Sequence, residues 1–297
     1  MKKSFLKLIL LLLCVFIIFN FPFTNEKPCS PENKYNSVIN AIDKTYPKNQ
    51  DTLRIMSYNL LADTPGFEGS PAYLRASGVC NILNTLKPDV AGLQEVGRNW
   101  FLSLNQGTTY SFISPVKTTV FGTMTAIIYN KETVILEDSG EYVFPETYNG
   151  KLRCAVWGLF KEKQSDKNFL VINTHLSLKE NGIDSPLEQA TNIIILANEL
   201  KERFNCPLFF VGDFNSDKRS LYNTSSACIY ETLCTVSTDT INLSCEKGFG
   251  ENKNFSSYSA DHIFLSGETD ILRYVILSQP DFVDLSDHYP IFIDIKI

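Results

Sequence analysis

Histidine is scarce in this chain, since only three of its 297 residues are histidines. They lie in the short polar motifs N-T-H-L-S (173–177), S-A-D-H-I-F (259–264) and S-D-H-Y-P (286–290). Two of the three directly follow an aspartate beside an apolar, β-like run. A single histidine is more often structural than catalytic, but a rare residue type that recurs in similar polar settings favours a chemical role.

The chain also lacks an excess of positive charge. Its 27 Lys and Arg residues stand against 33 Asp and Glu residues, which gives a net charge of −6 at pH 7, and the three lysines at positions 2, 3 and 7 offset what would otherwise be −9. Holding nucleic acid by bulk attraction requires a basic surface that displaces counterions. The composition therefore argues against such a protein, but it allows an enzyme that touches a few phosphates through a metal ion and one or two arginines.

Long apolar runs are absent. The longest uninterrupted part, Leu8 to Phe19, is twelve residues, which is short for a membrane-spanning helix. With the lysines before it, this run makes residues 1–23 a signal peptide, although the lack of an A-x-A-like cleavage motif leaves an uncleaved signal anchor open. Either alternative predicts that the rest of the chain is secreted or lies on the extracellular face of a membrane. Residues 24–51, which are polar and rich in Pro and Asn, are predicted to form an unstructured spacer.

No Gly/Ser linker, low-complexity run or internal repeat divides the chain after about residue 50, so residues 52–297 are predicted to form one domain. Seven cysteines follow Cys14, and three of them share residues 220–257 with all three N-glycosylation sequons. This segment is predicted to be an exposed, glycosylated excursion tied by disulfides. Its cysteines and sequon asparagines are Cys228, Cys234, Cys245, Asn223, Asn242 and Asn254.

Short apolar segments rich in β-branched and aromatic residues predict many strands and few helices. Helices are expected at residues 73–86 and 186–204. Strands are expected at residues 53–59, 90–93, 124–129, 154–160, 169–173, 208–211, 260–265 and 290–295. Many strands with few helices in one domain indicate two packed sheets with helices outside.

Polar residues stand at the ends of several of these predicted strands. Side chains distant in sequence can meet at one edge of a sheet, where loops tolerate polar groups. The set holds three carboxylates, two amides and two histidines: Asn59, Glu95, His175, Asp213, Asn215, Asp287 and His288. Neither a serine-histidine nucleophile motif nor a Cys-x-x-Cys pair accompanies them. Hard oxygen ligands favour Mg²⁺, with Mn²⁺ or Ca²⁺ as alternatives, over zinc.

Six motifs in order resemble the endonuclease/exonuclease/phosphatase superfamily, which has the DNase I-like fold. They are S-Y-N-L-L (57–61), P-D-V-A-G-L-Q-E-V (88–96), N-T-H-L-S (173–177), G-D-F-N-S (212–216), S-A-D-H-I-F (259–264) and S-D-H-Y-P-I (286–291). The resemblance covers about residues 52–297. It implies an α/β protein with a four-layer α/β/β/α sandwich of two mainly antiparallel sheets.

The resemblance also implies roles for single residues. Glu95 would be the principal metal carboxylate, with Asn59 close by and Asp287 sharing the ion. Asp213 and Asn215 would orient or activate the attacking water at the phosphate.

Both catalytic histidines receive roles in the same way. His288 would contact the scissile phosphate or act as the base, with Asp261 holding its other N–H, and the base is left open between His288 and Asp213. His175 would donate to a phosphoryl oxygen or to the leaving group. Arg153 matches a position from which an arginine would reach a substrate phosphate, although a surface salt bridge is an equal alternative. His262 is expected to be structural.

These roles imply a divalent-metal-dependent phosphodiester hydrolase, and a DNase-like nuclease is the favoured hypothesis. A sphingomyelinase-like phospholipase and a phosphomonoesterase of the same superfamily are alternatives, and a non-catalytic binding module on this fold is an alternative of another class. Expected partners are nucleic acid or another phosphodiester, with a membrane involved only through an N-terminal anchor. The protein is expected to be a monomer.

Overall fold

A computed structural model describes residues 36–63, 71–114, 124–148, 151–178, 185–216, 224–249, 260–278, 282 and 284–297. Several predictions lie outside these residues. They concern the signal segment 1–23, residues 24–35 of the predicted spacer, and the sequons at Asn223 and Asn254. Among the helices of the described ranges, none has the length and apolar character needed to cross a membrane.

The first sheet has seven strands: β1 (Leu53–Asn59), β2 (Val90–Val96), β3 (Ser111–Ile113), β4 (Met124–Tyr129), β10 (Glu246–Phe249), β12 (Asp270–Ile276) and β13 (Ile291–Lys296). Their order is β10-β12-β13-β1-β2-β4-β3. Pairing is antiparallel except between β1 and β2 and between β10 and β12.

The second sheet has six strands: β5 (Val134–Tyr148), β6 (Lys151–Glu162), β7 (Asn168–His175), β8 (Leu208–Asp213), β9 (Thr238–Asp239) and β11 (Asp261–Ser266). Their order is β5-β6-β7-β8-β11-β9, and only β7 and β8 are parallel. Both sheets are therefore mixed and mainly antiparallel, as predicted.

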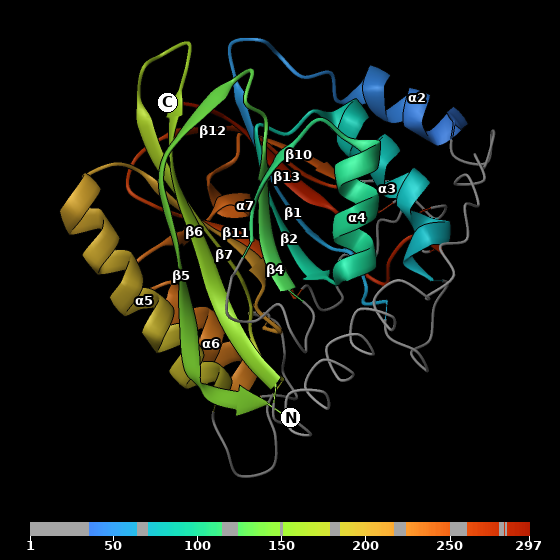
Figure 1. The fold of residues 1–297 in the computed structure, drawn as a ribbon. Coiled ribbons are helices and arrows are strands. Elements are labelled where there is room, and N and C mark those ends of the chain that lie inside the picture. Colours follow the sequence, from blue (N-terminus) through green and yellow to red (C-terminus); the bar gives the residue numbers. More distant parts are fainter. Residues whose placement is uncertain are drawn as a thin grey trace, which may run out of the picture. The chain divides into compact units, whose positions relative to one another are not determined.

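The helices are α2 (Asn36–Thr45), α3 (Ala72–Leu86), α4 (Arg98–Gly107), α5 (Ser185–Phe204), α6 (Thr224–Leu233) and the short α7 (Thr240–Leu243). Figure 1 shows α3 and α4 on the outer side of the first sheet and α5 and α6 on the outer side of the second. The predicted α/β sandwich with helices outside is confirmed.

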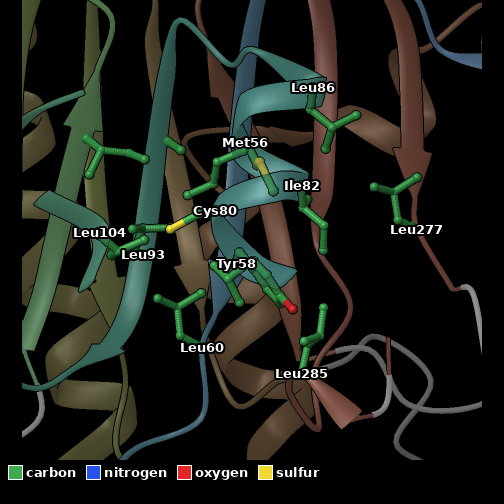
Figure 2. Packing of buried hydrophobic residues seen from close by; sticks show 14 of the residues in the cluster. Met56, Tyr58, Leu60, Cys80, Ile82, Leu86, Leu93, Leu104, Leu277 and Leu285 are labelled. Atoms are coloured by element: carbon green, nitrogen blue, oxygen red, sulfur yellow. The ribbon is translucent and has the colours of Figure 1, made fainter. Parts of the chain in front are cut away.

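Three apolar cores hold these layers together. In β1, alternate side chains point to opposite faces, so Met56 and Tyr58 pack under α3 while Leu53 and Ile55 pack between the sheets. Figure 2 shows the cluster that includes Met56 and Tyr58. Both faces of the strand are buried, so its polar residues Arg54, Ser57 and Asn59 are buried as well.

The prediction that residues 24–51 form an unstructured spacer is wrong for the described part of that segment. Residues 36–45 form α2, and Ile42 and Tyr46 are buried against the core below α3. Lys48 also forms a 2.7 Å ion pair with the buried Asp89. A short amphipathic helix inside a polar stretch gains its stability from docking, which composition does not reveal.

In the predicted excursion at residues 220–257, Cys228, Cys234 and Cys245 are exposed as expected, but the prediction that this segment stands apart from the core is wrong for residues 224–249. Ile229 and Leu233 of α6 are buried in the core of the second sheet. The next residues give β9 to the second sheet and β10 to the first. None of the cysteines in the described ranges forms a disulfide. Asn242, the sequon asparagine within the described ranges, is exposed on α7.

Candidate active site

Three of the predicted site residues are cross-strand neighbours in the second sheet. His175 lies opposite Asp213 on the parallel strands β7 and β8, and Asp213 lies opposite Asp261 on the antiparallel strands β8 and β11. The first two strands approach closely at Gly212, where a Cβ atom would lie 2.2 Å from the carbonyl oxygen of Thr174. Only glycine fits there, because any side chain would push the two strands apart and disturb the register that aligns the three side chains.

Glu95 reaches the same place from the first sheet, through a β-bulge. The pairing of β2 with β4 shifts register between Leu93 and Val96, and Glu95 in this bulge has a left-handed φ of 60°. A bulge re-aims a side chain, and strained backbone of this kind is common at functional sites. The Glu95 carboxylate accepts a 2.6 Å hydrogen bond from the backbone N–H of Ala62 and stays 20% exposed, so solvent ions can reach it.

Asn59, at the end of β1, connects the carboxylates of the two sheets. Its Nδ2 donates to Asp213 Oδ2 at 3.0 Å and lies 3.5 Å from Glu95 Oε1. Its Oδ1 accepts from the N–H of Leu61 at 3.0 Å, which fixes the orientation of the amide. Because a metal ligand would use the oxygen, this arrangement makes Asn59 a clamp on two carboxylates, and its role as a direct ligand stays a prediction.

His288 and Asp261 form the predicted carboxylate–histidine pair. Nδ1 of His288 lies 2.6 Å from Asp261 Oδ2, and its Nε2 lies 3.7 Å from Asp213 Oδ2. Ser286 positions this histidine, since its hydroxyl donates to the carbonyl of Asn59 at 2.7 Å and accepts the N–H of His288 at 3.2 Å. The residues before β13 are thereby joined to the end of β1.

The charge of His288 follows from its neighbours. Burial lowers the pKa of its imidazole, but the charge and hydrogen bond of Asp261, together with the charges of Asp213 and Asp287, outweigh burial and raise the pKa to about 10. The ring is therefore cationic at neutral pH. Such a fixed positive charge can stabilise the oxygens of a phosphate that is being attacked.

The pKa of Asp213 is also raised, but here burial is the main cause, because the side chain is almost fully buried. Burial and the negative charge of Asp261 raise the pKa of Asp213 to about 7, against the effects of His288 and of hydrogen bonds from Asn215 and Asn59. Asn215, whose φ is 48°, donates its backbone N–H to Asp213 at 2.9 Å and its side-chain amide to the carbonyl of Leu176 at 2.8 Å. A carboxylate held in this way and titrating near neutral pH suits a general base.

His175 is buried and uncharged. Its Nε2 lies 3.5 Å from Asp213 Oδ2, and its Nδ1 lies 4.0 Å from Glu95 Oε1 without a hydrogen-bond partner in the described part of the chain. Burial, the charge of Arg153 and the charge of His288 lower the pKa of His175 well below its usual value. The predicted residue Arg153, on β6, thus lies near enough to act on the site electrostatically, while its contact with a phosphate stays a prediction.

Two groups of side chains offer ligands for a divalent cation. Ligand atoms of Asp213, Asp261 and His288 lie within 4.8 Å of one another. A protonated imidazole cannot coordinate a metal, so this group requires His288 to lose its proton.

The predicted group is Glu95, Asn59 and Asp287. Its first two members lie together, whereas the side chain of Asp287 is 61% exposed and lies 4.0 Å from His288 Nε2. The carboxylate oxygens of Glu95 and Asp287 suit a hard cation such as Mg²⁺, and Nδ1 of His175, which has no hydrogen-bond partner among the described residues, lies 4.0 Å from Glu95 Oε1. The residues present therefore fit a divalent ion at Glu95.

His262 lies outside this group, as expected for a structural residue. Its Nδ1 is 3.0 Å from the Asp239 carboxylate and its Nε2 is 2.8 Å from the carbonyl of Ser216. The ring packs among the aromatic side chains of Phe214 and Tyr230.

Sequence reasoning gave no role to Ser286 or Ala62, although both hold site residues in place. Ser286 stands inside the S-D-H-Y-P motif, and a serine two residues before a histidine is a recognisable local hydrogen-bonding pattern. Ala62 acts through its backbone, which leaves no signal in the sequence.

The order of these residues along the chain matches a known family. The model of the endonuclease/exonuclease/phosphatase family matches residues 56–288. The chain belongs to this family. Family members are phosphoester hydrolases and generally depend on a divalent metal. A search among curated proteins finds no match to the chain.

Solved structures of the family share the fold. An endonuclease/exonuclease/phosphatase from Bacteroides vulgatus is similar with a TM-score of 0.70 and 23% identity, over 83% of this chain and 99% of that one. The mannosyl-6-phosphatase Bt3783 of Bacteroides thetaiotaomicron gives 0.69 and 22%, over 82% and 100%. The TDP2 of D. rerio, in complex with a single-strand DNA product, gives 0.62 and 20%, over 83% and 99%. The likeness confirms the predicted DNase I-like fold.

Proposed function

We propose that this protein is a divalent-metal-dependent hydrolase of phosphodiesters. One observation carries the proposal: a buried carboxylate, Asp213, is surrounded by a cationic histidine, a neutral histidine and a clamping amide, beside the accessible carboxylate of Glu95. A general base, a fixed positive charge and a hard-cation ligand are the groups that in-line attack of water on phosphorus requires.

Asp213 takes the proton of the attacking water in this mechanism. His288 is already protonated at neutral pH, so it cannot serve as the base, and Asp261 keeps it in this state. The water oxygen forms its bond to phosphorus as the bond to the leaving oxygen breaks. Asn215 holds the carboxylate of Asp213 in place through its backbone N–H.

The charge that develops on phosphate is met by donors that are fixed before the substrate arrives. His288 offers Nε2–H to a phosphoryl oxygen, and neutral His175 offers an N–H to a second oxygen or to the leaving group. Arg153 adds positive charge from β6. Glu95 would hold the metal ion, which would supply positive charge against the phosphate and the leaving oxygen.

The substrate we favour is nucleic acid, so that the protein is a DNase-like nuclease. The TDP2 structure with a DNA product supports a nucleic acid, while the mannosyl-6-phosphatase supports the alternative of a phosphomonoester. A sphingomyelinase-like phospholipase is the third candidate. Four substrates assayed side by side with Mg²⁺ or EDTA separate these activities: plasmid DNA, sphingomyelin, bis-p-nitrophenyl phosphate and mannose 6-phosphate.

Metal-dependent loss of DNA that disappears in His288→Ala supports the nuclease. Selective release of phosphocholine or of inorganic phosphate supports one of the other two activities. No hydrolysis of any of the four, with retained binding of DNA, overturns the enzymatic proposal in favour of a binding module.

We further propose that the protein acts as a monomer outside the cytosol. The short apolar run of residues 8–19 behind basic residues supports this location, and the exposed position of Asn242 is compatible with glycosylation there. A shift in mobility on treatment with a glycosidase, and its loss in Asn242→Gln, test the location. Sedimentation equilibrium tests the monomer.

A further inference from the structure

Arg75, on α3, is a buried cation outside the catalytic groups. Only 2% of the residue is exposed, and its guanidinium lies 4.8 Å from the centroid of the Trp100 ring. A buried charge is costly unless it is hydrogen-bonded, so its partners reveal what it holds in place.

The guanidinium binds the backbone of two segments that carry site residues. It donates to the carbonyl of Leu61 at 2.8 Å, to that of Leu60 and, at 3.5 Å, to that of Ala62, all in the segment that follows β1. It also donates to the carbonyl of Leu285 at 2.8 Å, in the segment before β13. Figure 2 shows Leu60 and Leu285 at the same end of the cluster below α3.

The first segment is strained, and Arg75 stabilises the strained shape. Leu61 has a left-handed φ of 58°, which is unfavourable for a branched side chain. Its carbonyl accepts from Arg75 and from the indole N–H of Trp100 at 2.9 Å. With Leu61 held in this conformation, the N–H of the next residue, Ala62, points at Glu95.

The second segment leads directly into the catalytic residues. Leu285 is followed by Ser286, which binds the carbonyl of Asn59, and then by Asp287 and His288. One guanidinium therefore bonds both to the loop that holds Glu95 and to the loop that carries Asp287. Both carboxylates are near enough to Arg75 for their charges to act on it.

We propose that Arg75 is a positioning residue that sets the affinity of the site for its divalent cation, by holding the Leu60–Ala62 segment against Leu285. This inference rests on the proposed function. Partners of metal ligands typically change metal affinity by about 10–100-fold when they are replaced. The guanidinium is required, because its N–H groups are spread over a planar fork and reach carbonyls of both segments at once. A lysine ammonium is a compact group that cannot span them.

Arg54 provides a matched control. It is also fully buried, donates to the carbonyl of Leu86 at 2.8 Å and lies over an aromatic ring, that of Phe292, at 4.3 Å. It stands at the start of β1, whereas the site lies beyond the end of that strand. A substitution at Arg54, which also weakens a buried ion pair with Asp294, therefore disturbs the fold at least as strongly without touching the metal loops.

The experiment measures Mg²⁺ binding to the full-length protein by calorimetry without substrate, together with melting temperatures with and without Mg²⁺. In Arg75→Lys we expect the Kd for Mg²⁺ to rise by about tenfold or more and the Mg²⁺-dependent gain in melting temperature to shrink. In Arg54→Lys the melting temperature falls while the Kd stays that of the wild type. Trp100→Phe, which removes the N–H to Leu61 and part of the ring that packs against the Arg75 guanidinium, gives a smaller rise in Kd and serves as the second variant if Arg75→Lys fails to fold.

The possible outcomes are distinguishable. An unchanged Kd in Arg75→Lys, or equal weakening in the Arg75 and Arg54 variants, overturns the positioning role and leaves Arg75 as a folding residue. With no folded Arg75→Lys, an unchanged Kd in Trp100→Phe overturns it equally. A wild-type protein that binds none of Mg²⁺, Mn²⁺ and Ca²⁺ overturns the proposed function, and this inference with it.

Discussion

Buried charges at the two ends of β1 are compensated by their neighbours in different ways. At the start of the strand, Arg54 forms a two-bond ion pair with Asp294 at 2.7 and 2.9 Å. Asp89 accepts from the backbone N–H of Arg54 at 2.6 Å and from Lys48 at 2.7 Å. Each of these groups is held by short, direct bonds to an opposite charge or to the backbone.

At the other end of the strand, beyond Asn59, some groups form short bonds, as His288 does with Asp261 at 2.6 Å, but other charged and polar groups lie near one another without a direct bond. The imidazole nitrogens of His175 and His288 lie between 3.5 and 4.0 Å from the carboxylates of Asp213 and Glu95. Burial raises the pKa of Asp213 because its charge is incompletely compensated. In the network around Arg54, which stabilises the fold, the polar groups bond to one another. In the network around Asp213, some polar groups are left to bond a metal ion and a phosphate.

The largest effect is expected from Glu95→Gln. Loss of the metal carboxylate should lower kcat/KM for bis-p-nitrophenyl phosphate by on the order of 10³-fold, because the charge on the phosphate is no longer neutralised. The far-ultraviolet circular dichroism and the melting temperature without metal should stay close to those of the wild type. A variant that keeps its activity would show that the metal binds at the other group, Asp213, Asp261 and His288.

The next effect concerns the opposite end of the strand. Asp294→Ala leaves Arg54 buried without its ion pair, and removing one partner of a buried pair costs about 3–5 kcal/mol. Urea unfolding should show this loss, while Mg²⁺ affinity of the protein that remains folded should be unchanged. A weakened Mg²⁺ affinity would contradict the separation of the two ends.

The smallest effect, taken per pH unit, is a pH dependence of stability. The pKa of His288 is raised from 6.5 in the unfolded chain to about 10 in the folded protein. Its contribution to stability is therefore fully present below pH 6.5 and is lost as the pH rises through 10, at up to about 1.4 kcal/mol per pH unit. In EDTA, the free energy of unfolding should fall between pH 7 and pH 10, and the fall should be smaller in His288→Gln. Equal slopes would mean that His288 is not held in the cationic form.

Strand positions were predictable because their segments are short, mostly apolar and rich in β-branched and aromatic residues. The runs at 53–59, 124–129 and 208–211 coincide with β1, β4 and most of β8, and the helix at 186–204 is α5. β5 was missed because V-I-L-E-D-S-G-E-Y-V mixes polar and apolar residues, as an edge strand with one covered face does. α2 was missed because its stability comes from docking rather than from composition.

The site was predictable as a set of residues but not as a geometry. His175, Asp213 and His288 stand in recognisable motifs, yet the register that aligns the first two is a property of strand pairing. Arg75 gave no signal, because an arginine in a helix usually lies on the surface. Protonation states were equally hidden, since they depend on burial and on neighbours distant in sequence.

The pairing of β1 with β13 joins Leu53 to Ile295, so the middle of the first sheet is completed by two nearly opposite ends of the domain. During synthesis, β1 has no antiparallel neighbour until almost the entire domain has been made. Pairing over such a long separation is intrinsically slow. A nascent chain of this kind remains open for a long time, which is a hazard in a crowded cytosol. For a polypeptide threaded through a membrane channel before it folds, as the proposed export requires, the same delay keeps the chain translocatable.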